Sequence, residues 1–159
     1  MSVRMELSRI LIREMTDQQI IELSEVGGSR RIPIVIGTPE AFAIERRLKG
    51  IEIPRPQTHD LLDTVIRELG GTLRMIEIHD LNDSTFFARL LIDRNGETFE
   101  VDSRPSDAIA LGIAGNVDIY VAESVLDQLQ SDESVDEEGD LADDDDLEFD
   151  PDDDENEPF

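Results

Sequence analysis

Apolar and polar residues alternate with a period of two over the first part of the chain, the spacing of half-buried β-strands. Three such runs follow one another, at residues 3–15, 19–26 and 32–36. The alternation slips once in the first run, as a β-bulge would cause. Gly27-Gly28-Ser29 supplies a turn between the second and third runs. The pattern therefore predicts a three-stranded antiparallel meander.

A helical spacing of apolar residues then replaces this alternation. Thr38-Pro39-Glu40 combines a capping hydroxyl, a proline at the first helical position and an acid in the first turn, and predicts a helix over residues 38–49. The segment 53–57 holds two prolines and cannot be helical. Thr58 is expected to cap a second helix over residues 58–69. Its apolar stripe consists of Leu61, Leu62, Val65, Ile66 and Leu69.

The second half of the chain repeats the strand pattern before returning to short helices. Strand-like runs occupy residues 72–79, 85–93 and 97–103, and Asn95-Gly96 is typical of a tight hairpin. Short helices at 105–114 and 123–129 and a short strand at 118–121 complete the pattern. Because helices and strands do not alternate regularly, the order favours an α+β fold with two antiparallel β-meanders and helices packed on them.

Acidic residues are concentrated at the C-terminus. The 159-residue chain has a formal charge of −25, and all 14 Lys and Arg lie at or before Arg104. Residues 1–130 carry a net charge of −8 and the remainder carries −17. The C-terminal segment has too few apolar side chains to offset the entropy cost of ordering. We therefore expect a single domain at 1–130 and a disordered acidic tail at 131–159.

The composition also narrows the setting of the protein. The chain has no cysteine, which excludes a disulfide framework and a thiolate metal site. Arg4, Glu6 and Arg9 interrupt the apolar N-terminal residues, unlike a signal peptide. No segment approaches the roughly 20 apolar residues of a membrane span. We expect a cytoplasmic protein without a membrane partner.

Ionisable residues gather where the second predicted helix begins, in Arg55-Pro56-Gln57-Thr58-His59-Asp60. In a structural interpretation Thr58 caps the helix and the helix dipole stabilises Asp60, which accounts for every residue except Arg55 and His59. The sequence alone favours this interpretation. In a functional interpretation the free amides form an anion site. Arg55 would then contact a phosphate, and His59 would act as a general acid or base.

A second polar stretch, Asp102-Ser103-Arg104-Pro105-Ser106-Asp107, precedes and opens the third helix. A structural interpretation pairs Arg104 with Asp102 or Asp107 to order the turn. A functional interpretation makes this helix start another anion site. Asp102 and Asp107 would then be candidate hard-oxygen ligands for Mg²⁺ or Mn²⁺, although two aspartates five residues apart do not by themselves specify a metal site.

Five segments resemble, in order, the signature blocks of the bifunctional nuclease family. They are residues 32–37, 40–44, 54–62, 85–88 and 102–111. The resemblance covers residues from about 5 to 125. It implies an α+β domain that hydrolyses both DNA and RNA with little sequence specificity.

The polar residues of two of these blocks are our candidate site residues. The candidate catalytic residues are His59, Asp60 and Asp107, the candidate phosphate-binding residues are Arg55, Thr58, Arg104 and Ser106, and the candidate Mg²⁺ or Mn²⁺ ligands are Asp102 and Asp107. These roles rest on general acid–base, electrostatic and metal-assisted chemistry.

Two functions remain open at this point. The leading hypothesis is a metal-assisted nuclease with nucleic acid as its substrate. The alternative is a noncatalytic regulatory module that binds an anion or a protein at its helix starts, and the negative charge supports it because like charge repels phosphates. If both polar stretches form one site, the helix starts at Thr58 and Pro105 must meet in one cleft or across the interface of a homo-oligomer.

Overall fold

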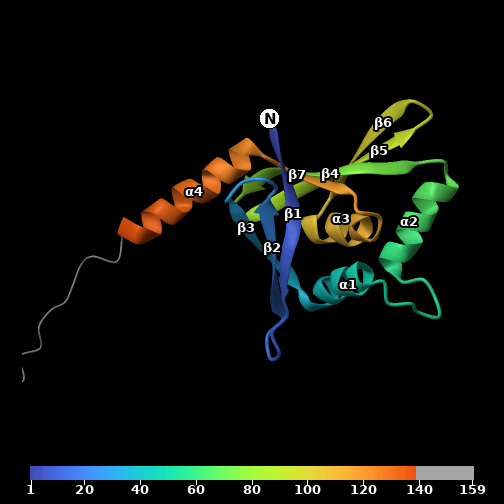
Figure 1. Cartoon of the computed structure of the whole chain (residues 1–159), viewed down its shortest axis with the longest axis horizontal. Coiled ribbons are helices and arrows are strands. Elements are labelled where there is room, and N and C mark those ends of the chain that lie inside the picture. Colours follow the sequence, from blue (N-terminus) through green and yellow to red (C-terminus); the bar gives the residue numbers. More distant parts are fainter. Residues whose placement is uncertain (139–159) are drawn as a thin grey trace, which may run out of the picture.

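The computed structural model describes residues 1–138 of the chain, with side chains described up to residue 133. In this part of the chain, seven strands form one mixed sheet in the order β3-β2-β1-β7-β4-β5-β6 (Figure 1). The strands are β1 (Ser2–Leu11), β2 (Gln18–Glu25), β3 (Arg31–Gly37), β4 (Thr72–Asn82), β5 (Thr85–Arg94), β6 (Glu97–Ser103) and β7 (Asp118–Ala122). The helices are α1 (Thr38–Lys49), α2 (Thr58–Glu68), α3 (Pro105–Gly112) and α4 (Glu123–Glu138), with a 3-10 turn at Ile113–Gly115.

Both predicted meanders are confirmed. β1, β2 and β3 pair antiparallel in succession, and the predicted bulge in the first strand lies between Leu7 and Arg9. β4, β5 and β6 form the second antiparallel meander. The α+β class expected from the order of the elements is therefore correct.

The last strand, β7, joins the two meanders into a single sheet. It pairs antiparallel with β1 and parallel with β4, so it occupies the centre of the sheet. Its inward residues Ile119 and Val121 are buried. The sequence predicted this short strand but not its position, because the alternation of apolar residues does not specify a strand's neighbours.

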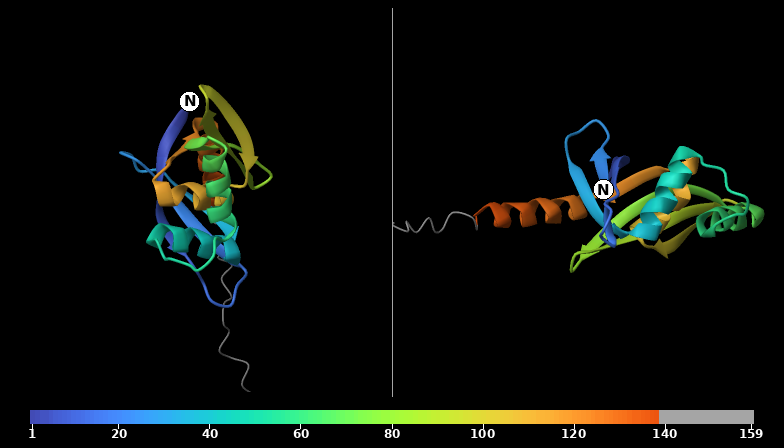
Figure 2. Two further views of the ribbon diagram at one scale, coloured as in Figure 1. Left: turned by 90° about the vertical axis from the view of Figure 1, so that its right-hand side faces the viewer. Right: turned by 90° about the horizontal axis from the view of Figure 1, so that it is seen from below.

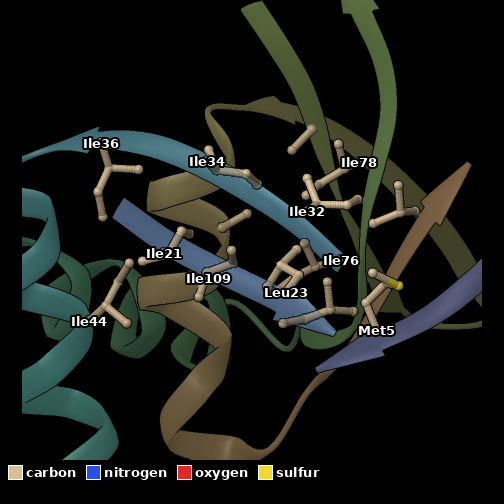
Figure 3. Packing of buried hydrophobic residues seen from close by; sticks show 14 of the residues in the cluster. Met5, Ile21, Leu23, Ile32, Ile34, Ile36, Ile44, Ile76, Ile78 and Ile109 are labelled. Carbon is tan, nitrogen blue, oxygen red and sulfur yellow. The ribbon is translucent and has the colours of Figure 1, made fainter. Parts of the chain in front are cut away.

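The core is aliphatic and is built around α3. Ala108, Ile109, Ala110 and Leu111 of this helix are each at most 3% exposed. The helix packs between α1 and strands β4 and β5. Figure 3 shows Ile21 and Leu23 of β2 near Ile109 of α3. Because α3 is packed from several sides, its first turn is held in a fixed position relative to α1.

Two predicted helix caps are wrong by one residue. α1 is capped by Gly37 rather than Thr38, and the Thr38 hydroxyl instead accepts a hydrogen bond of 3.1 Å from the buried Gln19 side chain. α2 is capped by Gln57 rather than Thr58. The backbone N–H of Gln57 donates to the Asp60 carboxylate over 3.0 Å. In both cases the predicted capping residue is already the first residue of the helix.

The apolar stripe predicted for α2 is present but is not buried. Leu61, Leu62, Val65 and Leu69 are each at least 40% exposed. Of the stripe, only Ile66 packs against the core. The helical periodicity of the sequence therefore predicted the element correctly but not the surface that it faces.

The last helix is longer than predicted. α4 continues to Glu138 instead of ending near Leu129, so the expected tail boundary at residue 131 falls inside a helix. Val125 and Leu126 anchor this helix in the core. The remainder of the predicted tail, residues 139–159, lies outside the described residues. None of the helices in the described part is long and apolar enough to cross a membrane.

Candidate functional site

The first turns of three helices meet at one pocket. Its volume is about 340 Å³, and its lining comes from α1, from the start of α2 and from the start of α3. The lining residues are Pro39, Glu40, Ala43, Gln57, Thr58, His59, Arg104 and Asp107. The helix starts at Thr58 and Pro105 therefore share one cleft, which confirms the geometric condition for a single site. Helix N-termini carry partial positive charge, so their convergence favours a bound anion.

Asp107 is the centre of a hydrogen-bonded network in this pocket. One of its carboxylate oxygens lies 2.9 Å from His59 Nε2, and the other accepts a hydrogen bond of 2.7 Å from Arg104 Nε. A second nitrogen of Arg104 donates to Glu40 over 3.3 Å. The network thus joins all three helices and includes three of the predicted site residues.

The contact with Asp107 orients the His59 imidazole. An ionised carboxylate can only accept, so Nε2 carries the hydrogen of this bond and the neutral ring has its lone pair on Nδ1. Among the described residues, Nδ1 has no hydrogen-bond partner. The side chain is 14% exposed, which holds it in place while keeping it accessible. A histidine held in one tautomer by a carboxylate is the arrangement that general-base catalysis uses.

The charges around Asp107 keep it ionised. Burial raises the pKa of its carboxyl group, but hydrogen bonds from Arg104 and His59 outweigh this effect and hold the pKa below its ordinary value. The same hydrogen bond raises the pKa of Arg104. Asp107 is therefore a carboxylate at neutral pH and is suited to orient His59 and Arg104, not to donate a proton.

Asp60 is engaged outside the pocket. Its carboxylate accepts hydrogen bonds from Arg46 over 2.6 Å, from Arg47 and from the backbone N–H of Gln57. Burial raises the pKa of its carboxyl group, but the hydrogen bonds from the Gln57 N–H and the two guanidinium groups lower it by more, so the net shift is downward. These bonds tie the start of α2 to the last turn of α1. Asp60 thus fixes the position of the neighbouring His59.

The remaining candidates are dispersed around the pocket. Thr58 lines it, whereas Arg55 is exposed in the connection between α1 and α2. Ser106 is buried and lines a second cavity instead of this pocket, and Asp102 is exposed near the end of β6. Asp102 is not among the residues that line the pocket of Asp107. Residues 1–133 contain no group of three His, Cys, Asp or Glu side chains suited to hold a metal ion.

A larger cavity of about 540 Å³ adjoins the pocket at Arg104. It follows residues 33–37, which belong to β3, an outer strand of the sheet. Asp17 and Arg104 are its only ionisable lining residues. The larger cavity therefore offers space along β3, while the groups able to perform chemistry gather in the smaller pocket beside it.

Sequence reasoning missed the contribution of α1 to the site. Glu40 was predicted only as an acid in the first turn of a helix and was not among the candidate site residues, yet its side chain is 20% exposed and contacts Arg104. Its position in the first turn of a helix was the available signal, since the other two polar stretches also open helices. Nothing in the sequence indicated that the start of α1 would join the starts of α2 and α3 at this pocket.

Comparisons with known proteins agree on one family. A family model described as the bifunctional nuclease domain matches residues 21–134. An uncharacterized protein of Mycobacterium tuberculosis is 43% identical over 119 residues, which cover 75% of this chain and 71% of that protein. Bifunctional nuclease 1 of Oryza sativa subsp. japonica is 27% identical over 105 residues, 64% of this chain and 32% of the rice protein. Bifunctional nuclease 2 of the same plant is 25% identical over 118 residues, 72% of this chain and 36% of that protein. The chain thus matches about a third of each rice protein.

Proposed function

Since the chain belongs to the bifunctional nuclease domain family, we propose that it hydrolyses phosphodiester bonds of DNA and RNA in the pocket where α1, α2 and α3 begin. The observation that carries this proposal is the hydrogen bond between His59 and Asp107 beside the guanidinium group of Arg104. This arrangement places an oriented general base, His59, beside the cation of Arg104, at helix N-termini that favour anions. The low sequence specificity follows from a pocket that would contact phosphates rather than base edges.

In this proposal His59 Nδ1 accepts a proton from a water molecule as the water oxygen attacks phosphorus. The bond from phosphorus to the leaving sugar oxygen breaks, and that oxygen takes up a proton from solvent water. The imidazolium returns its proton to the solvent, so one water is added across one P–O bond in total. Asp107 stabilises the imidazolium that forms, and Arg104 stabilises the negative charge that develops on the phosphate. The larger cavity along β3 would hold the nucleotides next to the cleaved bond.

A divalent metal ion remains an expectation from the sequence. Asp102 lies apart from the pocket, so an ion there would depend on Asp107 and Glu40 together with the substrate phosphate, as is usual for Mg²⁺. Such an ion would polarise the phosphoryl oxygens. The proposed roles of His59 and Arg104 do not require it, and the assay below treats the metal as a separate variable.

The test is cleavage of single-stranded DNA and RNA by the purified full chain, with Mg²⁺, with Mn²⁺ and with chelator. His59→Ala and Asp107→Asn should each lower the rate by about 10²–10⁴-fold. The chain contains only one other histidine, so His79→Ala is the matched control, and Asp102→Asn is the control for the carboxylate. Both controls should keep the activity of the unmodified chain. Undiminished cleavage by a His59→Ala, Asp107→Ala double variant would assign the activity to another site or to a contaminant.

The alternative function is a noncatalytic module that binds an anion or a protein at these helix starts. Among the described residues that line the pocket, Arg104 is the only Arg or Lys, and its ion pairs with Asp107 and Glu40 leave less positive charge to stabilise a phosphate during hydrolysis. If no metal condition gives cleavage, titration calorimetry with phosphate and a short oligonucleotide decides between the two functions. Binding that is lost in Arg104→Gln without any turnover would establish the alternative and refute the nuclease proposal.

A further inference from the structure

One surface of the molecule has the composition of a protein interior. We define the α2 apolar face as Leu61, Leu62, Val65 and Leu69, which are 55%, 40%, 43% and 64% exposed. An apolar stripe on a helix of a globular protein normally faces the core. Here no residue of α2 is buried, so the described part of the chain leaves this face without a partner.

The neighbouring edge of the sheet is also uncovered. Phe99 and Val101 of β6 are 45% and 43% exposed. They pair directly with Ile92 and Leu90 of β5, so their side chains lie on the same side of the sheet as those residues. Ile92 also lies close to Ile66 of α2, because both side chains surround Gly71. The apolar surface of β6 therefore lies on the side of the sheet that α2 covers.

We propose that a second copy of this chain covers the α2 apolar face, with the two α2 helices antiparallel about a twofold axis near Val65. The four side chains of this face and the two of β6 expose on the order of 600 Å² together, near the roughly 800 Å² that each partner buries in a stable interface. Monomeric proteins rarely leave apolar patches of this size uncovered. The inference is independent of the proposed nuclease activity.

The antiparallel arrangement makes the α2 apolar face complementary to itself. About an axis near Val65 it places Leu61 beside Leu69 of the partner subunit, so exposed apolar residues meet along the whole face. Antiparallel helices also place the N-terminal end of one copy beside the C-terminal end of the other, so the helix dipoles attract each other. This self-complementarity is what a twofold interface requires.

The interface would also border the pocket in which we propose that hydrolysis takes place. Thr58, Leu62 and Val65 lie four and three residues apart and so share one side of α2. Thr58 lines the pocket, whereas the other two belong to the α2 apolar face. The second copy would consequently border the pocket mouth beside Thr58. α4 projects from the opposite end of the molecule and does not approach this face (Figures 1 and 2).

The first experiment is sedimentation equilibrium of the full chain over a concentration series. We expect twice the 17.9 kDa mass of one chain. Val65→Asp places two carboxylates across the twofold axis and should weaken association at least about 100-fold. Val26→Asp is the matched control, because Val26 is 44% exposed in the turn after β2 and Val65 is 43% exposed. Two results would overturn the proposal. One is a full chain that stays monomeric at a protein concentration of about 100 µM, and the other is a dimer that survives Val65→Asp.

A second pair of variants identifies the geometry and does not depend on the folding of Val65→Asp. Because the chain has no cysteine, Val65→Cys should form a disulfide-linked dimer under mild oxidation, and Val26→Cys should not. Equal cross-linking of both cysteine variants contradicts the proposed interface.

Discussion

His59 and Asp107 illustrate what can be predicted for single residues. Each was identified from local signals, a polar residue in the first turn of a predicted helix. Their contact joins positions 48 residues apart, and no spacing rule connects them. Asp60 carried the same local signal as Asp107, yet it is bound by Arg46 and Arg47 from the preceding helix. The difference between a pocket residue and a positioning residue is thus set by tertiary packing.

Asp60 should contribute to stability in a pH-dependent way. Its pKa is lowered in the folded protein, so its contribution is present above its ordinary value of about 3.9 and is lost as the pH falls through the lowered value. Asp60→Asn takes the nearer of two carboxylates from Arg47, whose side chain is 6% exposed, and leaves only Asp63 at 3.8 Å. We expect a loss of about 2 kcal/mol in the free energy of unfolding at pH 7.

Urea denaturation at pH 7 and at pH 3 measures this effect at a fixed protein concentration. The difference between the unmodified chain and Asp60→Asn should shrink at the lower pH. Asp118→Asn removes an exposed ion pair with Arg4 and should cost less than about 1 kcal/mol. A difference for Asp60→Asn that is the same at both pH values would show that its ionisation does not stabilise the fold.

At the scale of elements, the strands and helices were predictable because their signals are local. The period-two runs gave both meanders, and Asn95-Gly96 correctly placed the hairpin between β5 and β6. Two features were not predictable. The central position of β7 depends on pairing with β1 and β4, and the uncovered stripe of α2 depends on what the core leaves free. Both are properties of packing between distant segments, which periodicity does not encode.

The close packing of α3 leads to a prediction about Gly112, its last residue. A Cβ added there would lie 2.6 Å from the Ile76 side chain and 3.0 Å from Val117. Because Ile76 is fully buried, Gly112→Ala should destabilise the protein by about 1–3 kcal/mol despite the better helix propensity of alanine.

Gly115→Ala provides the comparison, because the nearest atom to an added Cβ there is 3.9 Å away. Its effect should remain within about 0.5 kcal/mol in the same urea titration followed by circular dichroism. The strain in Gly112→Ala should also displace the first turn of α3, and with it Arg104 and Asp107. Cleavage should therefore fall in Gly112→Ala but not in Gly115→Ala. Equal stability of the two variants would mean that α3 can move without cost.

At the scale of the whole molecule, most of the positive charge is already neutralised. Within the described part of the chain, Arg9, Arg13, Arg55 and Arg94 are the basic residues without an ion pair. The chain as a whole carries −25. A nucleic acid would therefore bind through a few local cations against a repulsive overall field, which makes binding unusually sensitive to the acidic C-terminal residues.

Removal of residues 139–159 tests this sensitivity. The deletion takes away twelve acidic residues and no basic residue, and so changes the formal charge from −25 to −13. It retains α4, whose Val125 and Leu126 are buried, so the thermal midpoint should stay nearly unchanged. If the acidic residues oppose phosphate binding, the shortened chain should bind single-stranded oligonucleotides several-fold more tightly at low salt. The gain should fade as ionic strength rises, because a Debye length of about 10 Å at 0.1 M screens charges beyond that distance.

A variant with the twelve acids replaced by Asn and Gln separates charge from length, and it should match the shortened chain. Equal affinities of all three proteins across the salt series would leave these residues no part in binding and would assign them a role in solubility.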